Sequence, residues 1–368
     1  MKMRVSQLNA EAGFRLIENV NGLTKNPIVP RNTIITNEII DVLNAFAVTE
    51  VEVEKIDSNR KLKKKKEENQ QIGHISESIQ NDKQLLRFQQ HYQKVAKEYK
   101  KEFQRWQSGG TVNISIIRRL MIPLFEQLEK EPIHVLFLQN YIENVQDYIY
   151  HHAISVGLIS GYLAKRLNMN RGECFQITLA GSLCDCGMAK VNPGILNQNM
   201  INNDDQREIK LHPTYSYKML QNIPSLSTNA KLAVLKHHER IDGSGYPLKE
   251  KGKDIHIYAK IIAAADVYHA LICNRIYKSK VSPFRAIEIM TREMFGKLDV
   301  TALQALTNCL IQLSINMLVK LSTNQIGKIL FIDHRYPTRP VIQLVESNEV
   351  IQLNEKNDIS IKEILNFK

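Results

Sequence analysis

The sequence predicts a mainly α protein in which a helical bundle lies between a small β-rich N-terminal unit and a short C-terminal β-hairpin unit. Apolar residues recur at spacings of three and four through most of residues 111–322, which is typical of amphipathic helices. β-branched residues cluster between turn signals in residues 1–58 and again in residues 323–368, which is typical of short strands. Of the 368 residues, 43% are hydrophobic, so the chain can bury a sizeable core.

The N-terminal unit is predicted from two β-like runs that enclose a helical one. IVPRNTIIT and AVTEVEVE cluster or alternate β-branched residues, whereas NEIIDVLNAF between them has helical spacing. Residues 59–110 are interpreted as a basic linker, which holds the run RKLKKKK, followed by a long helix. Because ESIQNDKQLLRFQQHYQKVAKEYKKEFQRW has few apolar residues and no Gly or Pro, we expect this helix to be exposed, as a connector or a dimer contact.

Residues 111–322 are predicted to form an all-α bundle. Helical spacing is clear in IIRRLMIPLFEQL, ISVGLISGYLAKRL and AKLAVLKHH, and Gly or Pro residues separate the helical runs. Residues 323–368 are predicted to be a C-terminal β extension. Their β-like runs, IGKILFID, PVIQLVE and EVIQL, are short and are split by prolines and by Ser347-Asn348.

Charge and cysteine content narrow the class of protein. The formal net charge of +11 is spread over both halves of the chain and suits an anionic ligand or simple solubility. The basic run has no interleaved aromatic residues, so duplex nucleic acid is not an expected partner. Five cysteines without an apolar secretory region lead us to expect reduced thiols and a cytoplasmic location. No run of about 18 uncharged apolar residues is present, so no membrane span is expected.

Histidines and aspartates occur in apolar company or at helix ends inside the helical region. They are His152, Asp185, His212, His237, His238 and Asp266. Taken singly, each has an ordinary explanation as a hydrogen-bonded core residue or a helix cap. Taken together, imidazoles and carboxylates favour Fe, Mn or Zn over an all-oxygen calcium site. Adjacent residues on a helix point about 100° apart, so His237 and His238 would face two ions that lie close together.

The stretch HHERIDGSGYP, residues 237–247, is the most specific signal in the chain. It matches in full the pattern HHE-x-x-DG-x-GYP of the HD-GYP domain, a branch of the HD phosphohydrolase superfamily, and the similarity extends across roughly residues 135–320. YHHAISV resembles the family segment with the first ligand histidine, and HPTYSYKML resembles the HP segment. AKIIAAADVYHALICNRIYKSKVSP resembles the segment with a ligand aspartate and a basic pair. The resemblance implies an HD-superfamily helical bundle.

The resemblance also implies the composition of the site. Two divalent transition-metal ions, iron or manganese in most members and zinc as an alternative, are bridged by the aspartate that corresponds to Asp185, the implied catalytic residue. The implied metal ligands are His152, Asp185, His212, His237, His238 and Asp266. The implied substrate-binding residues are Gly243, Gly245, Tyr246, Pro247, Arg275 and Lys278. The implied substrate is a cyclic dinucleotide, typically cyclic di-GMP, which is opened to pGpG or cut to GMP.

The chain departs from the family pattern in the half that gives the family its name. CDCGMAK stands where the family has HDIGK, so Cys184 takes the place of a histidine ligand and Met188 that of a lysine. Cys184 has two readings, a thiolate ligand that favours Zn or Fe, or a small buried group without a metal. Tyr148 replaces an optional carboxylate ligand, and His269 replaces a second aspartate. These departures make slow or absent turnover an open alternative.

Two functions therefore follow from the sequence. The first is a metal-dependent phosphodiesterase that hydrolyses cyclic di-GMP. The second is a catalytically inactive HD-GYP protein that binds cyclic di-GMP or a protein partner in signalling. A homodimer through the long helix is a further expectation.

Overall fold

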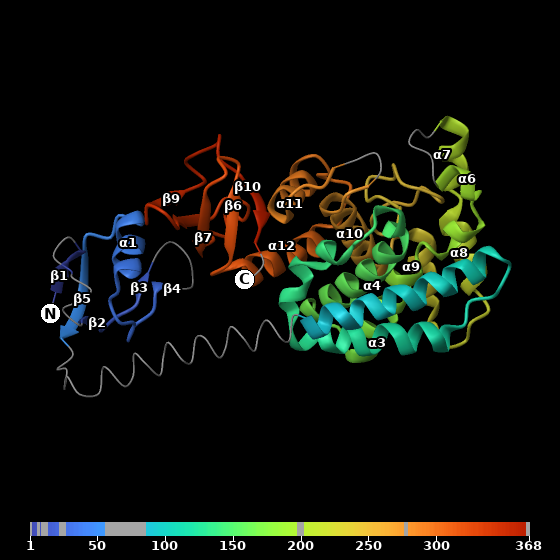
Figure 1. The fold of residues 1–368 in the computed structure, drawn as a ribbon, viewed down its shortest axis with the longest axis horizontal. Helices are drawn as coiled ribbons and strands as arrows, with labels where there is room; N and C mark the ends of the chain where they lie inside the picture. Colours follow the sequence, from blue (N-terminus) through green and yellow to red (C-terminus); the bar gives the residue numbers. More distant parts are fainter. Residues whose placement is uncertain are drawn as a thin grey trace. The chain divides into compact units, whose positions relative to one another are not determined.

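The computed structural model describes residues 2–5, 8, 14–21, 27–55, 86–196, 202–275 and 279–365, which group into two compact units (Figure 1). The β unit contains described residues from within 1–82 and 316–360, and the helical unit contains those from within 83–315 and 361–366. The predicted N-terminal and C-terminal β segments thus lie in one unit, which was not expected from the sequence. The run RKLKKKK lies outside the described residues.

The N-terminal half of the β unit follows the predicted order of strands and helix. Strands β1 (Lys2–Arg4) and β2 (Phe14–Leu16) both pair antiparallel with β5 (Glu50–Lys55), and β3 (Val20–Asn21) pairs with β4 (Pro27–Val29). Helix α1 (Asn37–Ala45) begins at Thr36, whose hydroxyl accepts a hydrogen bond from the Ile39 amide. The alternation in EVEVEK turns Val51 and Val53 inward against Leu16 and Leu43.

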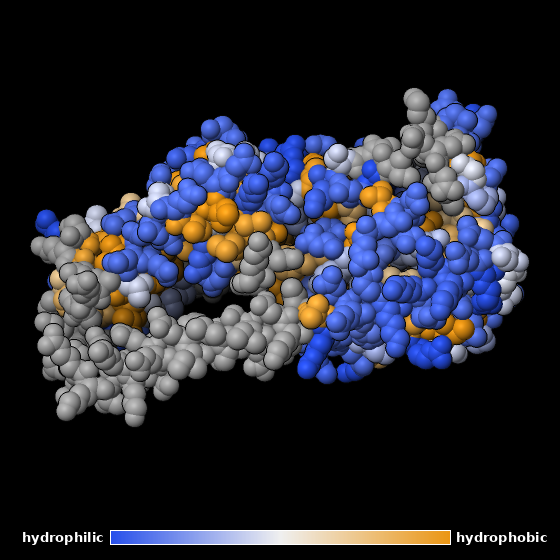
Figure 2. All heavy atoms as spheres, viewed as in Figure 1, coloured by the Kyte–Doolittle hydropathy of each residue, from blue (hydrophilic) through white to orange (hydrophobic). Residues whose placement is uncertain are grey.

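The C-terminal strands complete the same unit. Strands β6 (Leu318–Leu321), β7 (Ile326–Phe331), β8 (Val341–Leu344) and β9 (Val350–Gln352) pair antiparallel in chain order. Two contacts join them to the N-terminal half: the rings of Phe46 and Phe331 meet edge to face at 5.1 Å, and the Gln352 amide donates to the Ala45 carbonyl at 2.8 Å. Ile326 and Val345 are exposed apolar residues of this unit. Figure 2 shows hydrophobic patches on its surface.

The helical unit is built around α4, which is buried along most of its length. Helices α5, α10 and α3 pack against it. The bounds are α3 (Ile114–Lys130), α4 (Tyr148–Arg166), α5 (Arg171–Leu183), α6 (Pro193–Leu196), α7 (Asn203–Ile209), α8 (His212–Leu220), α9 (Thr228–Lys236), α10 (Ile257–Ile272), α11 (Pro283–Arg292) and α12 (Val300–Ser314), with β10 (Ile361–Ile364) beside α11. None of the helices that the structure describes has the length and hydropathy that a bilayer crossing requires.

The expectation of an exposed long helix is wrong for the described residues. The chain is helical from 86 to 107, and this segment belongs to the helical unit. Its aromatic residues are buried: Phe88, Tyr92, Tyr99 and Trp106 are each at most 1% exposed. Tyr92, Tyr99 and Trp106 are spaced by seven residues, so they lie on one face of the helix. A narrow stripe of large rings thus supplies the burial that the many charged residues seemed to exclude.

Candidate metal centre

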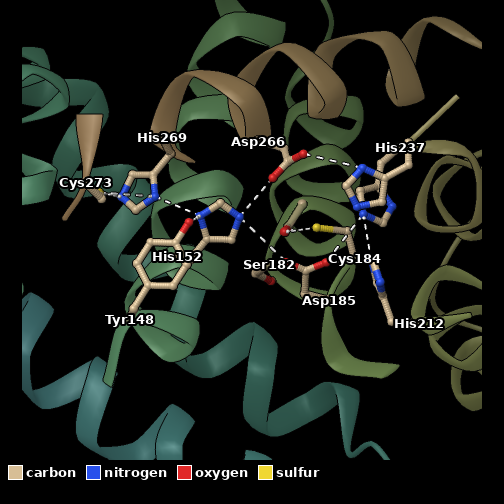
Figure 3. Close-up of polar contacts among 12 residues, drawn as sticks. Tyr148, His152, Ser182, Cys184, Asp185, His212, His237, Asp266, His269 and Cys273 are labelled. Carbon is tan, nitrogen blue, oxygen red and sulfur yellow. Dashed lines mark hydrogen bonds and ion pairs between the residues drawn. The ribbon is translucent and has the colours of Figure 1, made fainter. Parts of the chain in front are cut away.

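Five segments of the helical unit bring histidines and aspartates together (Figure 3). His152 lies in the first turns of α4, His212 is the first residue of α8, and Asp266 lies in the middle of α10. Asp185 follows the end of α5 and begins the 3-10 helix η6 (Cys186–Lys190). His237 and His238 directly follow α9. The structure therefore places all six of the uncontested predicted ligands in one cluster.

Gly187 explains how the chain after α5 comes so close to α8. A Cβ atom at this position would lie 2.2 Å from the His212 carbonyl oxygen and 2.5 Å from the Ser216 amide nitrogen. The Gly187 amide instead donates to the Ser216 hydroxyl at 2.7 Å. A residue without a side chain is therefore required to hold Asp185 beside His212.

On one side of the cluster, two imidazole nitrogens and one carboxylate oxygen face one another. The Nε2 atoms of His212 and His237 lie 3.1 and 3.4 Å from Asp185 Oδ1, and 3.4 Å from each other. Each ring directs Nδ1 at a backbone carbonyl, His212 at 2.6 Å and His237 at 2.7 Å. A carbonyl only accepts, so Nδ1 carries the proton and a neutral ring has its Nε2 lone pair toward the carboxylate. At this separation, either a cation lies between the two Nε2 atoms and Asp185 Oδ1, or the rings are doubly protonated and donate Nε2–H to that oxygen.

The other side of the cluster uses the other oxygen of Asp185. His152 Nε2 lies 3.6 Å from Asp185 Oδ2 and 2.9 Å from Asp266 Oδ1, while His238 Nδ1 lies 3.7 Å from Asp266 Oδ2. Asp185 therefore faces a different set of imidazoles with each of its two oxygens. This is the arrangement expected of a carboxylate that bridges two cations.

The donor set fits divalent metal. Atoms of Asp185, His212, His237 and His238 lie within 4.8 Å of one another, and mixed nitrogen and oxygen ligands suit first-row transition metals and zinc. Burial alone would raise the pKa of Asp185, but its contacts with His212 and His237 hold that pKa well below the usual range. Asp266 behaves in the same way, with burial opposed by the hydrogen bond from His152. Both carboxylates are thus kept ionised and ready to bind a cation.

Behind His152 lies a second layer of polar contacts. His152 Nδ1 is 2.9 Å from His269 Nδ1 and 3.0 Å from the Tyr148 hydroxyl, and His269 Nε2 is 3.4 Å from the Cys273 sulfur. Burial, followed by repulsion from His152, lowers the pKa of His269 well below its usual value. Tyr148 and His269, the two departures flanking this ligand, therefore replace carboxylates with neutral groups that still contact its ring.

Cys184 is fully buried at the end of α5, and its thiol donates to the Gly181 carbonyl at 3.1 Å. Burial, followed by the charge of Asp185, raises the pKa of the Cys184 thiol well above its usual value. A thiolate ligand requires the opposite shift. Among the described residues, the group of side chains able to hold a metal does not include Cys184. The structure favours the reading of this residue as a small buried group.

Met188 stands where the family has a lysine, and the nearby Lys190 does not replace the missing positive charge. Met188 is half-buried in η6, one turn after Asp185. Lys190 turns away and donates its ammonium group to the Trp106 carbonyl at 2.8 Å. Lys190 therefore does not supply the cation that Met188 lacks.

The GYP loop lies beside the imidazoles. The Tyr246 ring stacks on His238 with 4.7 Å between the ring centroids. The Lys210 ammonium group lies 5.8 Å from the centre of the Tyr246 ring. A Cβ atom at Gly245 would lie 2.4 Å from the Glu239 Cα and the Arg240 nitrogen. This close approach lets the Tyr246 amide donate to the His238 carbonyl at 3.2 Å.

The predicted basic pair is only partly described. Arg275 follows α10 and is half-buried, and its charge partly opposes the rise that burial causes in the pKa of Tyr148. Arg275 thus acts electrostatically on a residue that contacts His152. Lys278 lies outside the described residues. The substrate-binding roles of both residues stay predictions.

Glu239 was missed by the sequence reasoning, although it is part of the HHE pattern. It is 3% exposed, and its carboxylate accepts hydrogen bonds from the amides of Leu248, Lys249 and Glu250 at 2.6, 3.1 and 3.0 Å. An acidic residue placed between a helix end and a Gly-rich loop was the available signal. Its three acceptor contacts fix the loop that carries Tyr246 relative to His238.

We expect Glu239→Gln to lower the free energy of unfolding by about 2 kcal/mol, because an amide nitrogen replaces one of the accepting oxygens and faces a backbone donor. Urea unfolding followed by circular dichroism measures the change. The control is Glu98→Gln, which removes an exposed ion pair with Lys101 and should leave the free energy of unfolding nearly unchanged. Equal losses in the two variants would contradict the role assigned to Glu239.

Comparisons with known proteins agree with this geometry. Residues 137–301 match the family model described as HD domain. The chain is 27% identical over 225 residues to the cyclic di-GMP phosphodiesterase PdeB of Borreliella burgdorferi and 33% identical over 179 residues to a cyclic di-GMP phosphodiesterase of Thermotoga maritima. It is 30% identical over 236 residues to the 3′3′-cGAMP-specific phosphodiesterase 1 of Vibrio cholerae.

The matches cover part of each chain. They include 58%, 47% and 62% of this chain and 59%, 48% and 53% of those three relatives, respectively. Among solved structures, an HDG"Y"P protein from Bdellovibrio bacteriovorus aligns over 84% of this chain and 99% of its own, with a TM-score of 0.50 and 15% identity. At that identity the structural match supports the fold alone.

The helical bundle gathers imidazoles around two carboxylates, and this cluster has the residues that could hold a metal ion. The family match covers the segments that carry this cluster. Residues 137–301 therefore resemble an HD domain, and the complete HHERIDGSGYP stretch within them is similar to that of the HD-GYP branch.

Proposed function

We propose that this chain is a metal-dependent phosphodiesterase that hydrolyses a cyclic dinucleotide, with cyclic di-GMP as the first candidate substrate and pGpG or GMP as the product. The observation that carries the proposal is Asp185, whose two oxygens face different histidines of one buried cluster. The names of relatives from three organisms support the substrate class, and one of them points to 3′3′-cGAMP as a second substrate to test.

The residues of the chain divide the work as follows. Iron, manganese or zinc ions, when bound, would supply a hydroxide at neutral pH and neutralise charge on the phosphate. His212 and His237 would offer nitrogen ligands on one side of Asp185, and on the other side His152 would offer a nitrogen and Asp266 an oxygen. Tyr246, stacked on His238, offers an aromatic face beside the centre, and Lys210 places a positive charge next to that ring. An anionic, base-containing substrate fits these neighbours.

A second candidate function is binding of the cyclic dinucleotide without hydrolysis. It is favoured by Met188, which removes a cation one turn after Asp185, and by Lys190, whose ammonium group is engaged by the Trp106 carbonyl. Loss of one positive group near a reacting phosphate raises the barrier without removing the binding surface. The intact GYP loop and the ionised carboxylates fit either function.

Hydrolysis is tested with protein purified without oxygen, whose bound metal is measured before incubation with cyclic di-GMP and, separately, with 3′3′-cGAMP. We expect linear dinucleotide or mononucleotide on chromatography, loss of the product after chelation, and recovery when Mn²⁺ or Fe²⁺ is restored. Metal-loaded protein that yields no linear product from either compound would refute the enzyme. Heat evolved on titration of that inactive protein with a cyclic dinucleotide would then support the binding function, and absence of heat would refute it as well.

A further inference from the structure

Helix 86–107 makes three polar contacts near two predicted ligands: two of its tyrosine hydroxyls donate to backbone carbonyls, and the backbone carbonyl of Trp106 accepts from the Lys190 side chain. The residues concerned, Tyr92, Tyr99 and Trp106, recur every seven residues and lie along one stripe. Each contacts a different segment: α4, the end of α5, and the end of η6. These segments carry or flank His152 and Asp185, although no residue of helix 86–107 belongs to the cluster itself.

The contact with α4 is made next to His152. The Tyr92 hydroxyl donates to the carbonyl of His151 at 3.2 Å and lies 2.9 Å from the Ser155 hydroxyl. His151 precedes the ligand, and Ser155 lies about one turn after His151 on the same helix. The first turns of α4 are thus fixed against helix 86–107 by the hydroxyl of Tyr92, a residue that is fully buried.

The contact with α5 is made where helix bonding ends. The last carbonyls of a helix lack partners within it. Here the Tyr99 hydroxyl donates to the Ser182 carbonyl at 2.5 Å, the Cys184 thiol donates to the Gly181 carbonyl, and the Ser216 hydroxyl donates to the Cys184 carbonyl at 2.7 Å. Side chains therefore complete the end of α5, and the next residue along the chain is Asp185.

The contact with η6 closes the same stretch from its other end. Lys190 is the last residue of η6, and its ammonium group donates to the Trp106 carbonyl near the end of helix 86–107. Residues 182–190, which include Asp185, are thus held to helix 86–107 at both ends. The backbone that presents the bridging carboxylate has little freedom to shift unless this helix shifts with it.

We propose that helix 86–107 is a positioning element of the metal centre, and that Tyr92 and Tyr99 are positioning residues that act through the backbone of His152 and Asp185. The consequence for catalysis rests on the proposed function, but the consequence for metal binding does not. The hydroxyl groups, rather than the rings, carry the effect, because the rings pack while only the hydroxyls reach the carbonyls.

Tyr99→Phe is the decisive variant, because it keeps the ring and removes the bond to the end of α5. Tyr258→Phe is a matched control, since the buried Tyr258 donates its hydroxyl to Glu173 in the first turn of the same helix, at 3.1 Å. Two quantities are measured in each protein: the dissociation constant for Mn²⁺, and the electronic spectrum of the Co²⁺-loaded protein. Thermal unfolding is recorded alongside, to match the two variants in stability.

We expect Tyr99→Phe to weaken Mn²⁺ binding by about tenfold, at the lower end of what residues behind a ligand contribute, and to alter the Co²⁺ spectrum. Tyr258→Phe should leave both unchanged, although the two variants lose similar thermal stability. Tyr92→Phe should resemble Tyr99→Phe. Unchanged metal affinity and an unchanged spectrum in Tyr99→Phe would overturn the proposal, as would an equal effect in the control.

A second readout separates this inference from the proposed function. Hydrogen exchange of the amides of residues 184–190 is measured without metal or nucleotide, and we expect it to accelerate in Tyr99→Phe but not in Tyr258→Phe. If the wild-type chain binds metal and hydrolyses nothing, the phosphodiesterase fails while this inference stands on the affinities. If the wild-type chain binds no metal, exchange alone decides, and equal rates in both variants would overturn the inference.

Discussion

Asp185→Asn is expected to lower kcat/KM for cyclic dinucleotide hydrolysis by at least about 10³-fold and to reduce bound metal by at least one ion per chain. Asparagine keeps the shape of the side chain but removes its charge. One of its two terminal atoms becomes a donor, so it cannot face His212 and His237 with one oxygen and His152 with another. Metal analysis and product chromatography on the purified variant measure the two effects.

The matched control for this change is Asp204→Asn, which alters an exposed carboxylate paired with Arg207 in α7. It should leave metal content and rate near the wild-type values, because exposed ion pairs contribute little. Retention of full metal content and of more than about a tenth of the activity in Asp185→Asn would show that the carboxylate does not bridge the centre.

Met188→Lys is expected to raise kcat by about 10²-fold if the chain hydrolyses its substrate, because it adds a cation one turn after Asp185. The position is half-buried, so a lysine there can keep its charged end in contact with solvent. Lys190 does not already fill this role, since it is bound to the Trp106 carbonyl. Steady-state kinetics on the metal-loaded variant give kcat and KM separately.

Met188→Gln serves as the control, because it has a similar length and adds polarity without charge. We expect its kcat to stay within about threefold of the wild-type value, well below the change that a positioned charge produces. A lysine variant no faster than the glutamine variant would indicate that the missing charge does not limit the reaction.

The convergence of the cluster could be anticipated because the sequence marks its members by context. Asp266 stands among apolar residues at helical spacing, and His212 precedes a proline at a helix start. A buried charge needs a counter-charge, so such residues point to one another even before their distances are known. Their roles as ligands stay predictions until metal is measured.

The parts that could not be anticipated depend on contacts between distant segments. The sparse rings of helix 86–107 suggested an exposed helix because composition averages over all its faces. Glu239 was passed over because its partners are backbone amides about ten residues further along, which no residue letter records. The ring contact between Phe46 and Phe331 likewise joins residues far apart in the sequence.

The β unit has a topological consequence for the chain as a whole. The unit consists of one segment that precedes the helices and another that follows them, and these are joined through Phe46 with Phe331 and through Gln352 with Ala45. In sequence, most of the helical unit is therefore inserted between the two segments of the β unit. Proteolytic cleavage of the intervening polypeptide would leave two fragments that still associate. Loss of the contacts between the two segments would open the loop that they close, and the chain would gain conformational entropy.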